Sequence, residues 1–287
     1  MFDSLIRDLR YQLARNNPVV RIILINVAVF ILLNLLVRLI LLISGYSGLM
    51  LELKFRALVS WLAFPFSLSE FIVKPWTLIT SLFVHEGFFH IFWNLVILFW
   101  FGQIFTDVVR NKFYFTYFGG GIFATLFAFA GYSLFPGLFS AGYAYQLIGA
   151  SGAITAIMLA AATMVPEFRM NLLFIGPVKL KYIALVVLVL DLISLTYQSN
   201  TGGHLAHIGG GLFGFLFAFS LKNGTDWTTL IKFKKKTHLK TVHRNRSLSP
   251  REIQQRIDEI LDKINRSGYD SLSKDEKEDW FKYHDKV

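Results

Sequence analysis

Long apolar runs alternate with short polar breaks over most of the chain. A helix needs about 20 apolar residues to cross the ~30 Å hydrocarbon core of a bilayer, since each residue rises about 1.5 Å. The pattern therefore predicts an all-α membrane protein, with spans at residues 22–43, 88–106, 113–134, 151–164, 182–197 and 204–221.

The fourth apolar run is too short to cross the bilayer. Its residues, 151–164, rise only about 21 Å as a helix, and Pro166 follows closely. If this helix ends at one membrane face, Ser151 begins it inside the bilayer. Free backbone N–H groups there need protein or water around them, which makes a site for acyl-transfer chemistry. Packing of the small residues 149–152 against another helix is the alternative interpretation.

The segments outside the spans have their own patterns. Residues 44–75 are amphipathic and aromatic but interrupted, so we expect them in the membrane interface. Near the C-terminus, Ser249-Pro250 is typical of a helix start, apolar residues recur at helical spacing, and Ser273 with Glu276 forms a capping box. The predicted divisions are an N-terminal arm (1–21), a transmembrane domain (22–221), a basic juxtamembrane linker (222–248) and a C-terminal helical hairpin (249–287).

Charge and composition narrow the class. The chain is 54% hydrophobic, with a net charge of +10 and no cysteine, so disulfides and thiolate metal sites are excluded. Lysine and arginine concentrate at both ends and in alternate loops, so we expect no nucleic-acid partner. By the positive-inside rule we expect both termini of this multi-pass protein to be cytoplasmic. The basic run at 232–246 predicts association with anionic lipid.

Three polar side chains mark the start of the second span: His85, His90 and Asn94. The histidines lie five apart, about 140° around a helix, so they cannot form the zinc platform of an H-E-x-x-H helix, and we predict no metal. His90 and Asn94 lie four apart and share a face. Donors on an apolar helix are costly unless used. They either tie helices together or form an oxyanion hole, a set of donors aimed at charge developing on a carbonyl oxygen.

The last span carries a histidine within a glycine pattern. Gly210 and Gly214 let another helix approach closely, and His207 lies one turn earlier. Close packing of this helix on the fourth would bring His207 within reach of Ser151, as a nucleophile and its base require. His204, one turn before, is expected to be an interfacial histidine.

Together these residues resemble the rhomboid family of intramembrane serine proteases, of the six-helix bacterial type. The matching pieces, over roughly residues 20–221, are His85-x4-His90-x3-Asn94, Gly149-Ala150-Ser151-Gly152 and Gly202-x3-Ala206-His207-x2-Gly210-x3-Gly214. They occur in the family's order on the second, fourth and sixth predicted helices. Each motif alone is weak, whereas the three in order are specific.

The resemblance implies a six-transmembrane-helix rhomboid-like bundle with a short central fourth helix. In it Ser151 is the nucleophile and His207 the general base. His90, Asn94 and the serine backbone N–H form the oxyanion hole, and His85 supports a water-filled cavity. It also implies no cofactor and a location in a bacterial inner membrane. As substrates it implies the transmembrane segments of other membrane proteins, cut near a small residue close to the outer face.

Two departures qualify the resemblance. Many family members carry an aromatic residue four positions after the serine, where it stacks on the base, and here that position is Thr155. The base must then be oriented by something else. A Ser–His dyad without an acidic member is expected, because nothing in the sequence places Asp191 near His207. Asp191 is instead expected to pair with a helix neighbour or to line water.

Three functions compete on this basis. The first is an intramembrane serine endopeptidase. The second is a proteolytically silent rhomboid-like protein that binds membrane clients, which would require a damaged dyad. The third is a small transporter or channel, although the polar residues cluster on the outer half of the bundle. The C-terminal hairpin is too small for a secure core of its own, so we expect it to dock on a partner or on a second copy, or to stay partly disordered.

Overall fold

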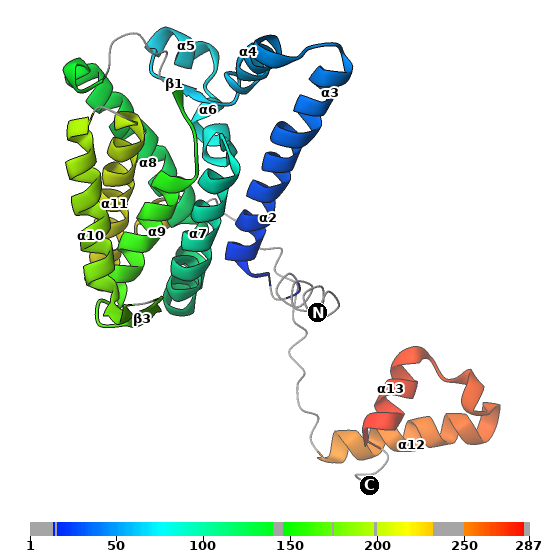
Figure 1. Ribbon diagram of the computed structural model, residues 1–287. Helices are drawn as coiled ribbons and strands as arrows, with labels where there is room; N and C mark the ends of the chain where they lie inside the picture. The colour runs from blue at the N-terminus through cyan, green and yellow to red at the C-terminus, as the bar shows by residue number, and fades with distance from the viewer. Residues whose placement is uncertain are drawn as a thin grey trace. The chain divides into compact units, whose positions relative to one another are not determined.

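The computed structural model describes residue 14 and residues 16–139, 146–173, 175–197, 200–231 and 250–283. The chain divides into two compact units, residues 1–232 and 233–287. The first holds the helical bundle and the second the C-terminal hairpin (Figure 1).

The bundle contains the six predicted helical segments, with ends shifted by a few residues. They are α2 (Pro18–Ile31), continued by the π-helix η1 (Leu32–Val37) and α3 (Arg38–Ile43); α7 (Phe88–Val109); α8 (Phe113–Leu134), after the 3-10 turn η3 (Arg110–Lys112); α9 (Ser151–Met164); α10 (Leu180–Ser194), extended by η5 (Leu195–Tyr197); and α11 (Thr201–Lys222). The all-α bundle with a short central fourth helix is thereby confirmed.

Length and composition mark three stretches of the described chain as able to cross a membrane. These are Pro18–Ile43, Phe88–Leu134 and Thr201–Lys222, of which the second contains both α7 and α8. Helix α9 is apolar but shorter. The chain is an integral membrane protein in which α9, with 14 residues, and α10, with 15, are shorter than a full span.

Helix α9 is the centre of the bundle. It packs against α7, α8, α10 and α11, and Figure 1 shows it between α7 on one side and α10 and α11 on the other. Its residues from Gly152 to Ala162 are all buried. A helix that is apolar all round belongs in an interior, and its many alanines let four neighbours come close.

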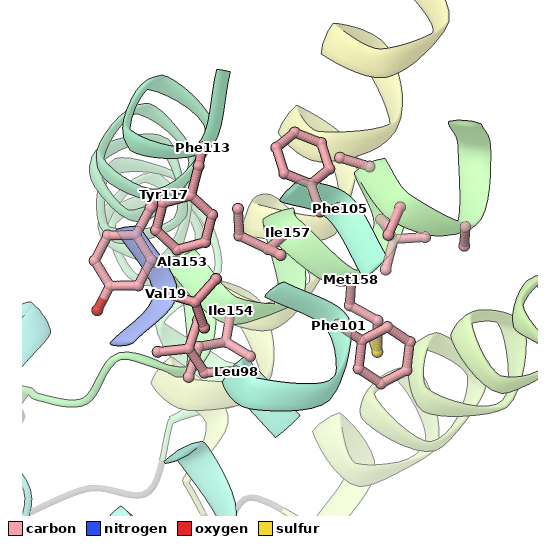
Figure 2. Packing of buried hydrophobic residues seen from close by; sticks show 14 of the residues in the cluster. Val19, Leu98, Phe101, Phe105, Phe113, Tyr117, Ala153, Ile154, Ile157 and Met158 are labelled. Atoms are coloured by element: carbon pink, nitrogen blue, oxygen red, sulfur yellow. The ribbon is translucent and has the colours of Figure 1, made fainter. Parts of the chain in front are cut away.

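One hydrophobic core joins α9 to α2, α7 and α8. Figure 2 shows Ile154, Ile157 and Met158 of α9 among the core residues contributed by the neighbouring helices. Those neighbours include Val19, Leu98, Phe101, Phe105, Phe113 and Tyr117. Large side chains on the outer helices thus fill the space left by small ones on α9, and this fixes the height and rotation of Ser151 at its start.

The loops contain short elements that the sequence pattern does not predict. Between α3 and α7 lie α4 (Gly48–Val59), β1 (Phe64–Pro65), α5 (Leu68–Val73), α6 (Thr77–Thr80) and η2 (Ser81–Phe83), and η4 (Pro136–Leu138) follows α8. Strand β1 pairs antiparallel with β2 (Gln146–Leu147), and β3 (Arg169–Leu172) pairs with β4 (Gly176–Lys179). Strands of two to four residues are too short to show an alternating pattern.

The bundle unit extends beyond Leu221, the predicted end of the transmembrane domain. The 3-10 turn η6 (Trp227–Ile231) follows α11, and the Trp227 ring packs on Phe213 and Phe217. The Lys112 ammonium binds the Asp226 carboxylate at 2.5 Å. These contacts add residues 223–231 to the bundle, whereas most of the predicted basic linker lies outside the described residues.

The second unit is a helical hairpin of α12 (Pro250–Ser267), η7 (Tyr269–Ser271) and α13 (Lys274–Tyr283). Ile257, Ile260 and Leu272 form its small buried core. The predicted capping box is present: the backbone N–H of Ser273 donates to Glu276, whose own N–H donates to the serine hydroxyl. Together with a salt bridge from Lys263, these donors lower the pKa of Glu276 to about 2.

Candidate active site

A cavity of about 460 Å³ opens where α7, α9, α10 and α11 meet. Its walls are mostly apolar. Its polar lining comes from His90, Asn94, Ser151, Thr155 and His207. Four of the five residues proposed from the sequence therefore share one cavity, and they come from three different helices.

Ser151 is the first residue of α9, and the two residues before it are held from outside the helix. The Gly149 N–H donates to the Ser81 carbonyl oxygen at 2.8 Å, and the Ala150 N–H donates to His85 Nε2 at 3.4 Å. Gly149 has φ +113°, a conformation that favours glycine. A Cβ there would lie 2.9 Å from His90 Nε2 and 3.8 Å from Ser151 Oγ. The tight turn thus gathers Ser151 and His90 around a position where a side chain does not fit.

His207 reaches the cavity because α9 and α11 pack backbone to backbone. A Cβ on Gly210 would lie 2.0 Å from the Gly152 carbonyl oxygen, and one on Gly152 would lie 3.3 Å from the Ala206 oxygen. Ser151 and His207 each adjoin one of these contact residues. The described residues include no direct hydrogen bond between them, and catalytic pairs are commonly longer before substrate binds.

His90 and Asn94 lie one turn apart on α7, as the spacing predicts. The Asn94 side-chain amide donates to the His90 carbonyl oxygen at 2.8 Å, which uses one of its two N–H bonds. Asn94 is buried and lines the cavity. Both residues line the same cavity as Ser151, because residues four apart share one face of a helix.

His85 does not line this cavity. It faces a second cavity of about 580 Å³ bordered by η1 and α4, and its ring lies 4.9 Å from that of His90. Its Nδ1 faces the Phe83 carbonyl oxygen at 3.3 Å, and its Nε2 accepts from Ala150. A carbonyl can only accept and an amide N–H can only donate, so the Nδ1–H tautomer is fixed. His85 anchors the turn before Ser151 through its ring.

Asp191 corrects the expectation drawn from the sequence. Its Oδ1 lies 2.9 Å from His207 Nδ1 and 2.8 Å from His204 Nδ1. The carboxylate comes from α10 and its side chain is only 7% exposed. Asp191 is therefore a direct neighbour of His207. A carboxylate that accepts the Nδ1–H of a histidine holds the ring in one orientation and leaves Nε2 free as a base.

This contact explains how His207 is oriented without an aromatic neighbour at position 155. The Thr155 hydroxyl donates to the Ser151 carbonyl oxygen at 2.8 Å, within its own helix. The His207 ring is therefore oriented by the contact of its edge with Asp191, and not by an aromatic side chain stacked on its face. The sequence carries part of this signal: an acid on an apolar helix is expensive unless partnered, which indicates that Asp191 has a partner without identifying His207 as that partner.

Comparison with known proteins places the chain in a family. The model of the Rhomboid domain matches residues 73–223, more than half of the chain. The chain belongs to the rhomboid family. All of the site residues, from His85 to His207, lie within the matched part. A second model, a family of unknown function termed DUF6576, matches residues 248–283 and so covers the C-terminal hairpin.

A curated relative supports this rhomboid assignment at low identity. Presenilin-associated rhomboid-like protein A, mitochondrial, from Danio rerio is 26% identical over 198 residues, which cover 64% of this chain and 49% of that protein. The rhomboid described here thus spans about half the length of that relative. Family membership and the membrane fold follow from these matches.

Proposed function

We propose that this rhomboid is an intramembrane serine endopeptidase that cleaves transmembrane segments of other membrane proteins. The observation that carries the proposal is that one cavity holds both Ser151, at the start of a helix, and His207. The Nδ1 atom of His207 contacts a carboxylate. A nucleophile, a base and a group that orients the base are the three parts serine chemistry uses.

In the proposed mechanism each of these residues has a step. The Ser151 oxygen attacks the substrate carbonyl carbon while its proton passes to His207 Nε2, and Asp191 stabilises the imidazolium formed. The negative charge on the carbonyl oxygen is met by N–H donors of His90, Asn94 and the Ser151 backbone. His207 then protonates the leaving nitrogen as the C–N bond breaks. A water repeats the sequence on the acyl-enzyme, releasing the acid and restoring the serine.

The choice of substrate class rests on the position of Ser151. Helix α9 has 14 residues, a rise of about 21 Å against the ~30 Å hydrocarbon core. A helix of that length that reaches one membrane face starts within the bilayer, where transmembrane segments are the available peptides. We propose further that both termini are cytoplasmic in a bacterial inner membrane, with Ser151 opening toward the opposite side. The rhomboid resemblance adds cleavage near a small residue.

The test is proteolysis of a model transmembrane substrate by the purified protein in detergent. Ser151→Ala and His207→Ala are each expected to abolish cleavage while the protein stays helical, and a mechanism-based serine inhibitor should label Ser151. Normal cleavage by either variant would refute the assignment. A wild-type protein that is folded but neither cleaves nor is labelled would favour the silent, client-binding alternative.

A further inference from the structure

Asp191, His204 and His207 form a compact cluster across α10 and α11. Each offers one ligand atom, a carboxylate oxygen or a histidine ring nitrogen, and the three atoms lie within 4.8 Å of one another. The two nitrogens are both in contact with the same carboxylate oxygen. Three converging donors from two helices that are packed together form a preorganised site rather than a chance surface group.

The donor set has the chemistry of a zinc site. Two imidazoles and a carboxylate with one position left open are ligands that Zn²⁺ takes, at about 2.0–2.2 Å each. Tetrahedral ligands at that distance lie about 3.4 Å apart. The present separations of 2.8 and 2.9 Å would need to open by only about 0.5 Å, which side-chain rotation can supply.

A second observation points to a ligand. Asp191 Oδ2 is buried and has no hydrogen-bond partner among the described residues, although a buried carboxylate oxygen is costly when unpaired. The cluster is also reachable, since the side chains of His204 and His207 are 20% and 23% exposed. We propose that these three residues bind a divalent cation of the zinc class, and that the bound cation inhibits the protein.

The inhibition follows from tautomer chemistry, and this part rests on the proposed protease function. In the resting site Nδ1 of His207 carries the proton and Nε2 has the free electron pair that accepts the serine proton. A cation takes the electron pair of Nδ1, so the ring proton must move to Nε2 through solvent. The base then has no free pair on the side of Ser151. The cation and the serine proton thus require opposite tautomers of one ring.

The other histidine pair does not offer this chemistry. Both nitrogens of His85 already face backbone groups, the Phe83 oxygen and the Ala150 N–H. The His90 ring lies 4.9 Å from the His85 ring, but His85 has no uncommitted nitrogen to share with His90 in a metal site. Zinc sensitivity should therefore follow His204 and not His90.

Binding is tested without any need for activity. The full chain carrying Ser151→Ala, without a polyhistidine tag and with His238, His243 and His284 replaced by glutamine, is titrated with Zn²⁺ in a calorimeter. We expect one Zn²⁺ per chain. Adding His204→Gln should weaken binding at least about tenfold, since even second-shell changes weaken metal sites by about 10–100-fold. Adding His90→Gln, the matched control, should leave it unchanged. No binding, or loss of binding with His90→Gln alone, would overturn the proposal.

Inhibition is tested on the same background with Ser151 restored. Zn²⁺ should lower kcat and leave KM unchanged, because the cation lies on the Nδ1 side of His207, and EDTA should restore the rate. Each variant is compared with its own zinc-free rate, and His204→Gln should raise the half-inhibitory zinc concentration at least about tenfold. Equal zinc sensitivity in that variant would overturn the proposal. A chain that binds zinc at the cluster but never cleaves would overturn the protease function while the site itself stands.

Discussion

Gly210→Ala tests whether the contact between α9 and α11 sets the distance between the nucleophile and its base. The new Cβ would lie 2.0 Å from the Gly152 oxygen and 2.9 Å from its carbonyl carbon. Both are backbone atoms, which cannot rotate away. Ordinary contact begins at 3.4 Å, so the helices must separate by about 1.4 Å. Gly152 follows Ser151 directly, and Gly210 lies one turn from His207, so this separation falls on the pair.

The structure gives the expected size of the effect. Alanine favours a helix interior over glycine by about 1 kcal/mol, whereas overpacking a close contact costs about 1–3 kcal/mol. Because the atoms met are backbone, we expect the upper end of that cost and a net loss of about 1–2 kcal/mol of stability. A displacement of about 1 Å between reacting groups lowers turnover about 100-fold. Activity should therefore fall much further than stability.

The assay pairs cleavage of a model transmembrane substrate with thermal unfolding in detergent. Gly211→Ala is the matched control in the same helix, since the atoms nearest to its Cβ would be in the Leu188 and Leu159 side chains, at 3.1 and 3.4 Å. Those chain ends can move, so this variant should keep its rate within a few-fold. Wild-type turnover in Gly210→Ala, or an equal loss in both variants, would refute the reasoning.

The remaining predictions concern the other parts of the site and the tail. Asp191→Asn should lower kcat by about 100-fold or more and leave KM nearly unchanged, since it frees the ring of the base; steady-state kinetics that show an unaltered kcat would count against a positioning role. His90→Ala with Asn94→Ala should cost turnover up to about 4 kcal/mol in barrier height, and an unchanged rate would leave only a helix-bonding role. The hairpin should loosen as pH falls from about 5 to about 2, because the carboxylate of Glu276 has its pKa lowered to about 2 and so stabilises the fold only while ionised; hydrogen exchange corrected for intrinsic rates should show this, and Glu276→Gln should remove the acid dependence. Truncation after about Lys236 should keep cleavage within a few-fold in detergent and in anionic liposomes, and a folded but inactive product would place the hairpin in the catalytic unit.

The sequence was sufficient for the helices because their signal is local. Apolar runs with short polar breaks located all six, and the break at Pro166 marked the short α9. The rule that residues four apart share one face of a helix placed His90 and Asn94 together. The glycines of the last helix correctly indicated a close approach, although which helix would meet Gly210 was an inference from chemistry rather than from the pattern.

The sequence could not predict the contacts that depend on how two neighbouring helices are rotated relative to one another. The rotation of α10 against α11 decides whether Asp191 meets His207 or a different neighbour, and apolar residues on all sides of α10 leave that rotation unmarked. The two-residue pairing of β1 with β2 is similar, because a pair so short has no period to detect. The role of His85 as an anchor for Ala150 likewise required the fold.

The contacts that hold the segment after α11 against the bundle have a mechanical consequence. The Lys112 ammonium holds both the Asp226 carboxylate and the Thr228 hydroxyl, at 2.5 and 2.7 Å. Trp227, which lies between these two residues in the sequence, packs its ring against the side of α11. A pull on the chain beyond Ile231 is therefore resisted first by the turn that joins α7 to α8, and not by the helical hydrogen bonds of α11. Tension from anything that grips the tail would reach the membrane domain without unwinding the helix that carries its base.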